Sequence, residues 1–433
     1  MLFAIVASLV FVGATLLVVF GACYTAAGKG EFLSPGELAR KFIEFWVSEG
    51  KTRYVNLKIV LFGMLVRVVM LGLAFLFLYF DRGRDYSLDG IFYAFNRWDA
   101  THFLNLAETG YSWTERGNNI LLVFFPLYPY LIRLVNFTVG NYVASAYIVS
   151  FVSYLVGICY VYHLARLDFS ARVAWWAVVL LSVFPHSFFF GAPHTESLFL
   201  LTTAMSLYYI RKHNWLAAGI AGGFATATRM VGVFLIAAAA IEFIMHYKLF
   251  ELMKNGQWTN FLKLVFTKGI LILIMFAGTG VYLFINWQIS GDPLRFLYYQ
   301  YYNWNNGFRF FGAVMIEQFT AIIPFWGEES TAMNYIFIPN VLGFAFCIWM
   351  IGYASLKRFN TGQIVYSLGY TLVSFSMLWL LSGGRYAAAL VPAFIFLGDF
   401  VDGRKFRGGI VLSVFVAGLM IVLRRYVFGG FVM

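Results

Sequence analysis

The chain has 433 residues, of which 61% are hydrophobic, 20% are aromatic and only 12% are charged. A soluble domain carries about twice that share of charged residues, so the composition excludes a soluble globular protein and indicates an integral membrane protein. The formal net charge of +11 does not indicate nucleic-acid binding, because the basic residues lie in short loops between apolar runs. Cys23, Cys159 and Cys347 lie far apart, so no disulfide framework or zinc site is predicted.

Apolar runs recur along the whole chain. A hydrocarbon core of about 30 Å requires about 20 apolar residues per transmembrane helix. The sequence therefore predicts an all-α polytopic membrane protein with one domain, residues 1–433, and about 12 transmembrane helices. The predicted spans are residues 1–25, 58–80, 142–164, 171–190, 195–210, 214–229, 231–247, 268–287, 331–354, 362–381, 386–401 and 409–426. Two further apolar stretches, 120–139 and 312–326, are ambiguous.

Lysine positions decide the topology. If neither 120–139 nor 312–326 crosses the membrane, every lysine of the chain falls on one side, which the positive-inside rule identifies as cytoplasmic. A crossing at 120–139 would place all lysines from Lys212 to Lys268 outside. This stretch is therefore predicted to lie along the membrane or to re-enter it.

Three further regions follow from this topology. Residues 1–57 form an extra N-terminal helix and a basic cytoplasmic segment. Cleavage of the first helix as a signal peptide would leave basic residues outside, so its retention is favoured. Residues 81–141 form an external catalytic loop, and residues 288–330 form a second external loop that is rich in aromatic side chains.

The external loop 81–141 contains the leading candidate for chemistry, Asp99, which lies in the segment 97–103 (RWDATHF). A carboxylate buried between apolar surfaces and a bilayer has a raised pKa, which suits a proton acceptor. Asp99 can equally be the N-cap of a short helix over 100–109, and the two roles can coexist. Glu108 is nine residues further on, about 180° around a helix, so we expect it to be structural and to lie away from the reaction centre.

Arginines on the external side are informative because lysine is confined to the other side. Arginine binds phosphate oxygens bidentately, so we expect Arg385 to hold a lipid phosphate, with Arg229 as the second candidate. Glycines 383–384 precede Arg385 and would allow a ligand to approach the backbone closely. The alternative is that these arginines only snorkel at helix ends.

Two more external segments carry polar side chains. The turn 185–197 places His194 and Glu196 at the start of a span, where the helix dipole favours an acidic residue. No close ligand pair of the His-x-x-x-His type supports a metal there, and no metal site is predicted. The aromatic and amide residues at 292–311, which include Trp304, suit the faces and hydroxyls of a sugar, and they equally suit an interfacial aromatic belt.

Several of these segments, taken in order, resemble the PIG-V-like mannosyltransferases, the family of the enzyme that adds the second mannose to the GPI anchor. The segments are Arg97–Phe103, Leu106–Tyr111, Phe124–Pro129, Ser187–Phe199 and Thr228–Gly232. The resemblance covers about residues 58–250. The segment Ser382–Leu397, with Arg385 and Tyr386, resembles the arginine-tyrosine segment near the C-terminus of many GT-C glycosyltransferases.

The resemblance implies a GT-C fold, a polyprenyl- or dolichyl-phosphate-mannose donor, a catalytic aspartate that carries over onto Asp99, and membrane-parallel helices in the first external loop. Eukaryotic members have Glu where this chain has Thr101, which leaves the acceptor specificity open and suggests a prokaryotic relative. Arg97, Trp98, His102 and Tyr386 belong to the matching segments. They are expected to contact sugar or acceptor, or to orient the groups that do.

The leading hypothesis is therefore a glycosyltransferase. It moves a hexose, with mannose as the first candidate, to an acceptor hydroxyl with inversion, without metal or cofactor and with Asp99 as general base. The acceptor is a glycolipid, a lipid-linked glycan or a protein. The reaction takes place on the non-cytoplasmic face of a bacterial or archaeal membrane, or of the ER membrane.

The alternative is a transporter or flippase of lipid-linked saccharides. A transporter needs polar groups near the bilayer midplane and paired, broken repeats. Here Arg67 and Glu242 are the main charges inside spans, and no repeat is visible, which favours an enzyme.

Overall fold

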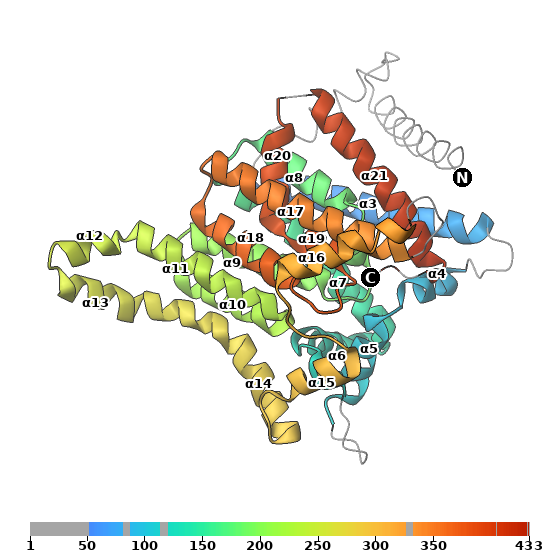
Figure 1. Ribbon diagram of the computed structural model, residues 1–433, viewed down its shortest axis with the longest axis horizontal. Coiled ribbons are helices and arrows are strands. Elements are labelled where there is room, and N and C mark those ends of the chain that lie inside the picture. Colours follow the sequence, from blue (N-terminus) through green and yellow to red (C-terminus); the bar gives the residue numbers. More distant parts are fainter. Residues whose placement is uncertain are drawn as a thin grey trace.

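The computed structural model is built from helices joined by short connections (Figure 1). It describes residues 52–80, 87–112, 120–325, 332–403, 405–430 and 432. The predicted first span, 1–25, and most of the basic segment after it lie outside these residues. Within them, the only extended pairing is a single antiparallel bridge between Phe308 and Met377.

The elements follow one another in chain order with short turns. The first group comprises α3 (Thr52–Phe80), α4 (Leu88–Phe95), α5 (Asp99–Thr109), η1 (Ile120–Val123), α6 (Leu127–Val139), α7 (Tyr142–Ala165), α8 (Ala171–Val183), η2 (Ser187–Gly191), α9 (Glu196–Arg211), α10 (Trp215–Thr228) and η3 (Met230–Val233). The second group comprises α11 (Phe234–His246), α12 (Leu249–Lys254), α13 (Trp258–Thr267), η4 (Gly269–Phe276), α14 (Ala277–Ser290), α15 (Arg295–Trp304), α16 (Phe311–Thr320), η5 (Ile323–Phe325), η6 (Met333–Phe337), α17 (Ile338–Leu356), α18 (Thr361–Ser374), α19 (Gly383–Ala389), α20 (Val391–Val401) and α21 (Lys405–Val427).

The chain is a multi-pass, all-helical integral membrane protein. Five helical segments of the described chain are long and apolar enough to cross a membrane: Tyr54–Phe80, Tyr142–Ala165, Trp258–Ser290, Met333–Leu356 and Phe406–Val427. The bent pair α19 and α20 makes a sixth if it counts as one span. Helices α8, α9, α10 and α18 have 13 to 16 residues, which cover about 20–24 Å of a hydrocarbon core of about 30 Å. The predicted number of about 12 spans is therefore not confirmed.

The predicted span 386–401 is not one straight helix. The structure has two helices there, α19 and α20, which meet at Leu390 with a bend of 74°. Pro392 lies in the first turn of α20. A proline has no N–H and disfavours helical backbone at the residue before it, so the preceding helix ends just ahead of it. The break allows α19 to follow its own direction, with Arg385 in its middle.

Polar clusters occupy the two opposite ends of helix α9. Its last residue, Arg211, donates hydrogen bonds to Asp168 and to Glu242, and Asn360 also donates to Glu242. Its first residue, Glu196, lies 15 residues earlier, about 22 Å away along the helix. Lys212 directly follows α9, so the end that carries Glu196 is opposite to the one that carries lysine.

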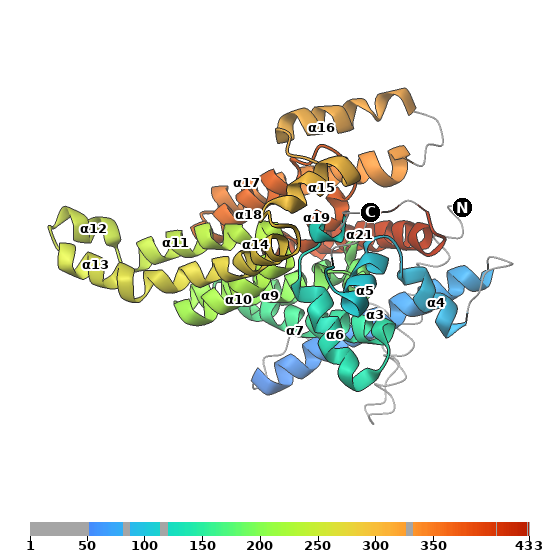
Figure 2. The ribbon, with the colours of Figure 1, turned by 90° about the horizontal axis from the view of Figure 1, so that it is seen from below.

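The loop predicted to contain the site folds into short helices beside α7. Figure 2 shows α5 and α6 next to each other, and both contact α7. Helix α6 has 13 residues, or about 20 Å, and that 120–139 does not cross the membrane stays a prediction. Arg133 of α6 donates from Nε to the backbone oxygen of Ala107 at 2.7 Å. Because the last carbonyls of a helix lack partners within it, this contact fixes the end of α5.

Candidate functional site

Asp99 is the first residue of α5. The residue before it, Trp98, has φ 57° and ψ −126°, a backbone conformation that bulky residues rarely adopt and that is found mostly at functional sites. Trp98 occupies the N-cap position and no side chain caps the helix there, so the interpretation of Asp99 as the N-cap was wrong. The side chain of Asp99 instead accepts a hydrogen bond from Arg385, with 3.3 Å between Oδ2 and Nη1.

Arg385 is the residue that joins Asp99 to the rest of the cluster. Its side chain is 7% exposed, whereas that of Asp99 is 33% exposed. Nε of Arg385 donates to Oε1 of Glu196 at 2.7 Å, and the guanidinium lies 4.6 Å from the ring centre of Phe189. Two of the five N–H groups of Arg385 are used in these two bonds, which leaves three as potential donors to a ligand.

Glu196 is the fully buried centre of this cluster. Its Oε1 accepts hydrogen bonds from both Arg385 and Arg229. Nε of Arg229 also donates to Oγ1 of Thr195 at 2.9 Å, so the residue that precedes Glu196 helps to orient the second arginine. Two arginines and two carboxylates together carry no net charge, and the buried charges are therefore compensated within the cluster.

His194 and His186 lie in the wall behind the arginines. His194 is fully buried, and burial, together with the positive charge of Arg385, lowers its pKa to about 4, so its ring is neutral at pH 7. His186 packs against Gly384, where an added Cβ would lie 2.1 Å from Cε1 of the imidazole. An added Cβ at Gly383 would lie 2.7 Å from Oδ1 of Asn340. Side chains of the protein itself thus fill the space beside both glycines. The prediction that a ligand approaches the backbone there was wrong.

His102 and Trp304 meet beside Asp99. His102 is three residues after Asp99 on α5, so the two side chains lie on one face of the helix. The His102 ring is 5.2 Å from the ring of Phe124 and 5.3 Å from that of Trp304, the last residue of α15. Burial lowers the pKa of His102, and the negative charge of Asp99 partly opposes this shift. The two external loops predicted at 81–141 and 288–330 therefore contact each other at these rings.

Other predicted residues have different surroundings. Arg97 donates to the backbone oxygens of Ala94 and Val427, so it ties the turn before α5 to the end of α21. Trp98 packs against the apolar cluster that includes residues of α21. Glu108 is exposed near the far end of α5, and its structural role stays a prediction. Tyr386 directly follows Arg385, and its backbone oxygen accepts a bond from the hydroxyl of Tyr370.

Three contact residues of the site were not singled out from the sequence as site residues. Phe189 carries the cation–π contact of Arg385, Thr195 binds Arg229, and Phe124 completes the ring cluster. Phe124 and Phe189 lie in apolar runs, which are typical of a hydrophobic core. Thr195 precedes a helix, where threonine is a common residue. Only their position within the segments that resemble known mannosyltransferases marked them.

Residues 125–287 match the family model of the dolichyl-phosphate-mannose-protein mannosyltransferases. The matched segment is less than half of the chain; it contains Glu196 and Arg229, whereas Asp99 and Arg385 lie outside it. Over these residues the chain is similar to dolichyl-phosphate-mannose-dependent enzymes, and the activity of the whole chain stays a prediction. The finer resemblance to PIG-V-like enzymes stays a prediction.

Several solved structures are similar at low identity. ArnT from Cupriavidus metallidurans bound to undecaprenyl phosphate is 17% identical, with a TM-score of 0.48 over 81% of this chain and 62% of that one. The oligosaccharyltransferase of Archaeoglobus fulgidus is 13% identical, with a TM-score of 0.43 over 84% and 55%. The chain thus spans about three fifths or less of these proteins. Because the TM-scores lie below 0.5, we draw no conclusion from them, and the GT-C fold stays a prediction. No curated protein matches the chain.

Proposed function

We propose that the protein transfers a hexose, with mannose as the first candidate, from a polyprenyl- or dolichyl-phosphate carrier to an acceptor hydroxyl. The observation that carries this proposal is the pairing of the partly exposed Asp99 with the buried Arg385. A carboxylate within reach of a substrate and an arginine beside it are the two groups that such a transfer requires. The family match of residues 125–287 supports the same class of donor.

In this mechanism Asp99 is the general base. The acceptor oxygen attacks the anomeric carbon from the face opposite to the carrier, and its proton passes to the carboxylate of Asp99. The bond from the anomeric carbon to the phosphate oxygen breaks, and its electron pair leaves with the carrier phosphate. One bond forms as another breaks on the opposite face, so the configuration at the anomeric carbon is inverted.

Arg385 stabilises the phosphate that leaves. Its bonds to Asp99 and Glu196 hold the guanidinium in place before substrate binds, and its remaining N–H groups donate to the phosphate oxygens. Arg229 binds the same carboxylate oxygen and is the second source of positive charge. Glu196 is fully buried between them, so its part is to hold both arginines in position.

The rings of His102 and Trp304 bind the sugar. His102 lies on α5 together with Asp99, and Trp304 ends α15; their aromatic faces and edges stack on the C–H faces of a hexose. Nε1 of Trp304 makes no hydrogen bond to any part of the chain that the structure describes, and a sugar hydroxyl is a suitable acceptor for it. The site opens to the non-cytoplasmic face, because it lies at the end of α9 opposite to Lys212.

The test is to offer the purified enzyme one donor at a time in the presence of EDTA, with membranes from cells that lack the gene as the source of acceptor. We expect transfer from polyprenyl-phosphate-mannose and none from GDP-mannose. Polyprenyl-phosphate-glucose, offered in parallel, tests the choice of sugar. Transfer from the nucleotide sugar alone, or loss of all activity on chelation, contradicts the proposed mechanism.

A further inference from the structure

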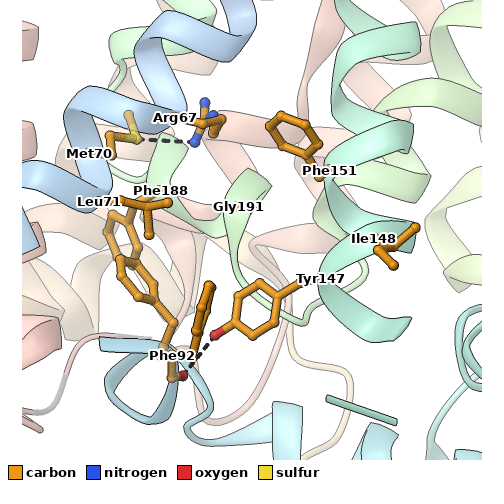
Figure 3. Close-up of a pocket in the computed structure, with 10 residues that line it drawn as sticks. Arg67, Met70, Leu71, Phe92, Tyr147, Ile148, Phe151, Phe188 and Gly191 are labelled. Atoms are coloured by element: carbon orange, nitrogen blue, oxygen red, sulfur yellow. Dashed lines mark hydrogen bonds between the residues drawn. The ribbon is translucent and has the colours of Figure 1, made fainter. Parts of the chain in front are cut away.

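A second feature of the molecule lies behind the wall of the Asp99 site. It is a cavity of about 220 Å³ between α3, α4, α7 and η2 (Figure 3). Its walls are apolar and aromatic, with Met70, Phe92, Phe151 and Phe188 among the lining residues. The one charged residue in the lining is Arg67.

Arg67 lies in the middle of the predicted span 58–80 and is only 4% exposed. Its Nη1 donates to the backbone oxygen of Ser187 at 2.8 Å and to Sδ of Met70 at 3.1 Å, and the guanidinium lies 4.0 Å from the ring centre of Tyr154. Within the part of the chain that the structure describes, Nε and Nη2 make no hydrogen bond and no carboxylate pairs with Arg67. A buried cation without a counter-ion is costly, so this position calls for an anion.

The cavity and the Asp99 site share one wall, the short element η2. Phe188 lines the cavity, and its ring centre is 4.5 Å from that of the next residue, Phe189. Phe189 in turn lies under the guanidinium of Arg385. On the other side, Phe92 of α4 lines the cavity and lies seven residues before Asp99. Its backbone oxygen accepts a hydrogen bond from the hydroxyl of Tyr147. Phe188, Phe189 and Arg385 therefore lie in succession between the cavity and the carboxylate of Asp99.

The lining defines the chemistry of the occupant. A guanidinium favours a phosphate, which it binds through two oxygens, and the apolar walls favour a hydrocarbon chain. Apolar cavities of about 150 Å³ take up benzene, so this cavity has room for the first carbons of one chain next to a headgroup. Arg385 is already bonded to two carboxylates, whereas Arg67 has none in the described chain. The two arginines therefore serve different anions.

We propose that this cavity is a second lipid-phosphate site, in which Arg67 binds the phosphate of a single-chain amphiphile and the aromatic walls hold the start of its chain. This assignment rests on the proposed function for its role: the occupant is the acceptor lipid, whose hydroxyl-bearing headgroup reaches Asp99 past η2. Its binding chemistry rests on the cavity alone and is tested without turnover.

The experiment is photolabelling of the full-length protein in phosphatidylcholine nanodiscs. The probe is hexadecyl phosphate with a diazirine near the phosphate, and hexadecanol with the same diazirine is the uncharged control. We expect the phosphate probe to label peptides that contain Met70 or Phe151 about tenfold more than the alcohol, the factor for one charge-assisted hydrogen bond. Unlabelled dodecyl phosphate should compete, and inorganic phosphate should not.

Variants separate the cavity from other sources of labelling. Arg67→Gln should reduce labelling to the level of the alcohol. Ile148→Trp, at the partly exposed edge of the cavity, should block labelling while Arg67 is kept. The matched control is Arg172→Gln, which removes an exposed arginine that pairs with Asp402 and does not line the cavity. It should label like the wild type.

Three results overturn the proposal: equal labelling by both probes, wild-type labelling of both Arg67→Gln and Ile148→Trp, or competition by inorganic phosphate alone. Asp99→Asn should label like the wild type, because binding precedes chemistry. If Asp99→Asn keeps its transfer activity while Arg67→Gln loses its label, the proposed function fails and the lipid site stands. The reverse result refutes the lipid site alone.

Discussion

Replacement of Glu196 by Gln tests the charge balance of the candidate site. Glu196 is fully buried and its Oε1 accepts bonds from both Arg229 and Arg385. Loss of one partner from a buried ion pair costs about 3–5 kcal/mol, because the remaining charge stays buried without compensation. Glutamine keeps one acceptor oxygen, so we expect the lower end, about 3 kcal/mol. Transfer should also slow, because a neutral amide holds Arg385 beside Asp99 less strongly than a carboxylate does.

The measurement is equilibrium unfolding in mixed micelles, followed by tryptophan fluorescence. Glu108→Gln is the matched control: it makes the same change at an exposed position and should alter the free energy of unfolding by no more than about 0.5 kcal/mol. Arg229→Gln combined with Glu196→Gln restores the charge balance, so the double variant should be more stable than the sum of the single changes predicts, by about 0.5–3 kcal/mol. A cost below about 1 kcal/mol for Glu196→Gln, or strict additivity, would refute the charge-compensated cluster.

Three further predictions follow from the site and the topology. Arg385→Lys should lower transfer by more than about tenfold although the charge is kept, because lysine cannot bind both carboxylates through a planar fork; turnover within about twofold of wild type would contradict this. The low pKa of His194 means that the unfolded chain takes up its proton first as pH falls, so stability should be lost from about pH 6.5 towards pH 4, by up to about 3 kcal/mol. In unfolding experiments across this range, His194→Gln should flatten the dependence, and an unchanged slope would argue against a buried neutral ring. In a chain without its native cysteines, Ser112→Cys should react with an impermeant thiol reagent in intact cells and Asn255→Cys should not; the reverse pattern would place the site on the other face.

The positions of the helices, and which of their ends carry lysine, were predictable from the sequence because they depend on local properties. Apolar runs marked the helices, and the confinement of lysine separated the two ends that α9 joins in the structure. The break of the predicted span 386–401 has a local signal in the sequence, Pro392 in the first turn of α20. The number of spans depends on how short helices sit in the bilayer, which apolar runs alone do not determine.

The contacts of the candidate site were less accessible. Arg385 bonds Glu196 and Asp99 across 189 and 286 positions of sequence, and no spacing rule connects residues so far apart. The sequence resemblance identified these residues as candidates for one site, but it did not reveal that Glu196 is buried between two arginines. Nor did it show that Gly384 gives way to the ring of His186, because a glycine that admits a ligand and one that admits a neighbouring side chain look the same in sequence.

The assignment of Asp99 as general base is tested most directly by the turnover of Asp99→Asn. Asparagine keeps the shape of the side chain and removes its basicity. Because a general base contributes about 10²–10⁴-fold to rate, release of polyprenyl phosphate from polyprenyl-phosphate-mannose should fall by at least about 100-fold, with donor binding nearly unchanged. Turnover above about a tenth of the wild-type value would contradict the assignment of Asp99 as the base.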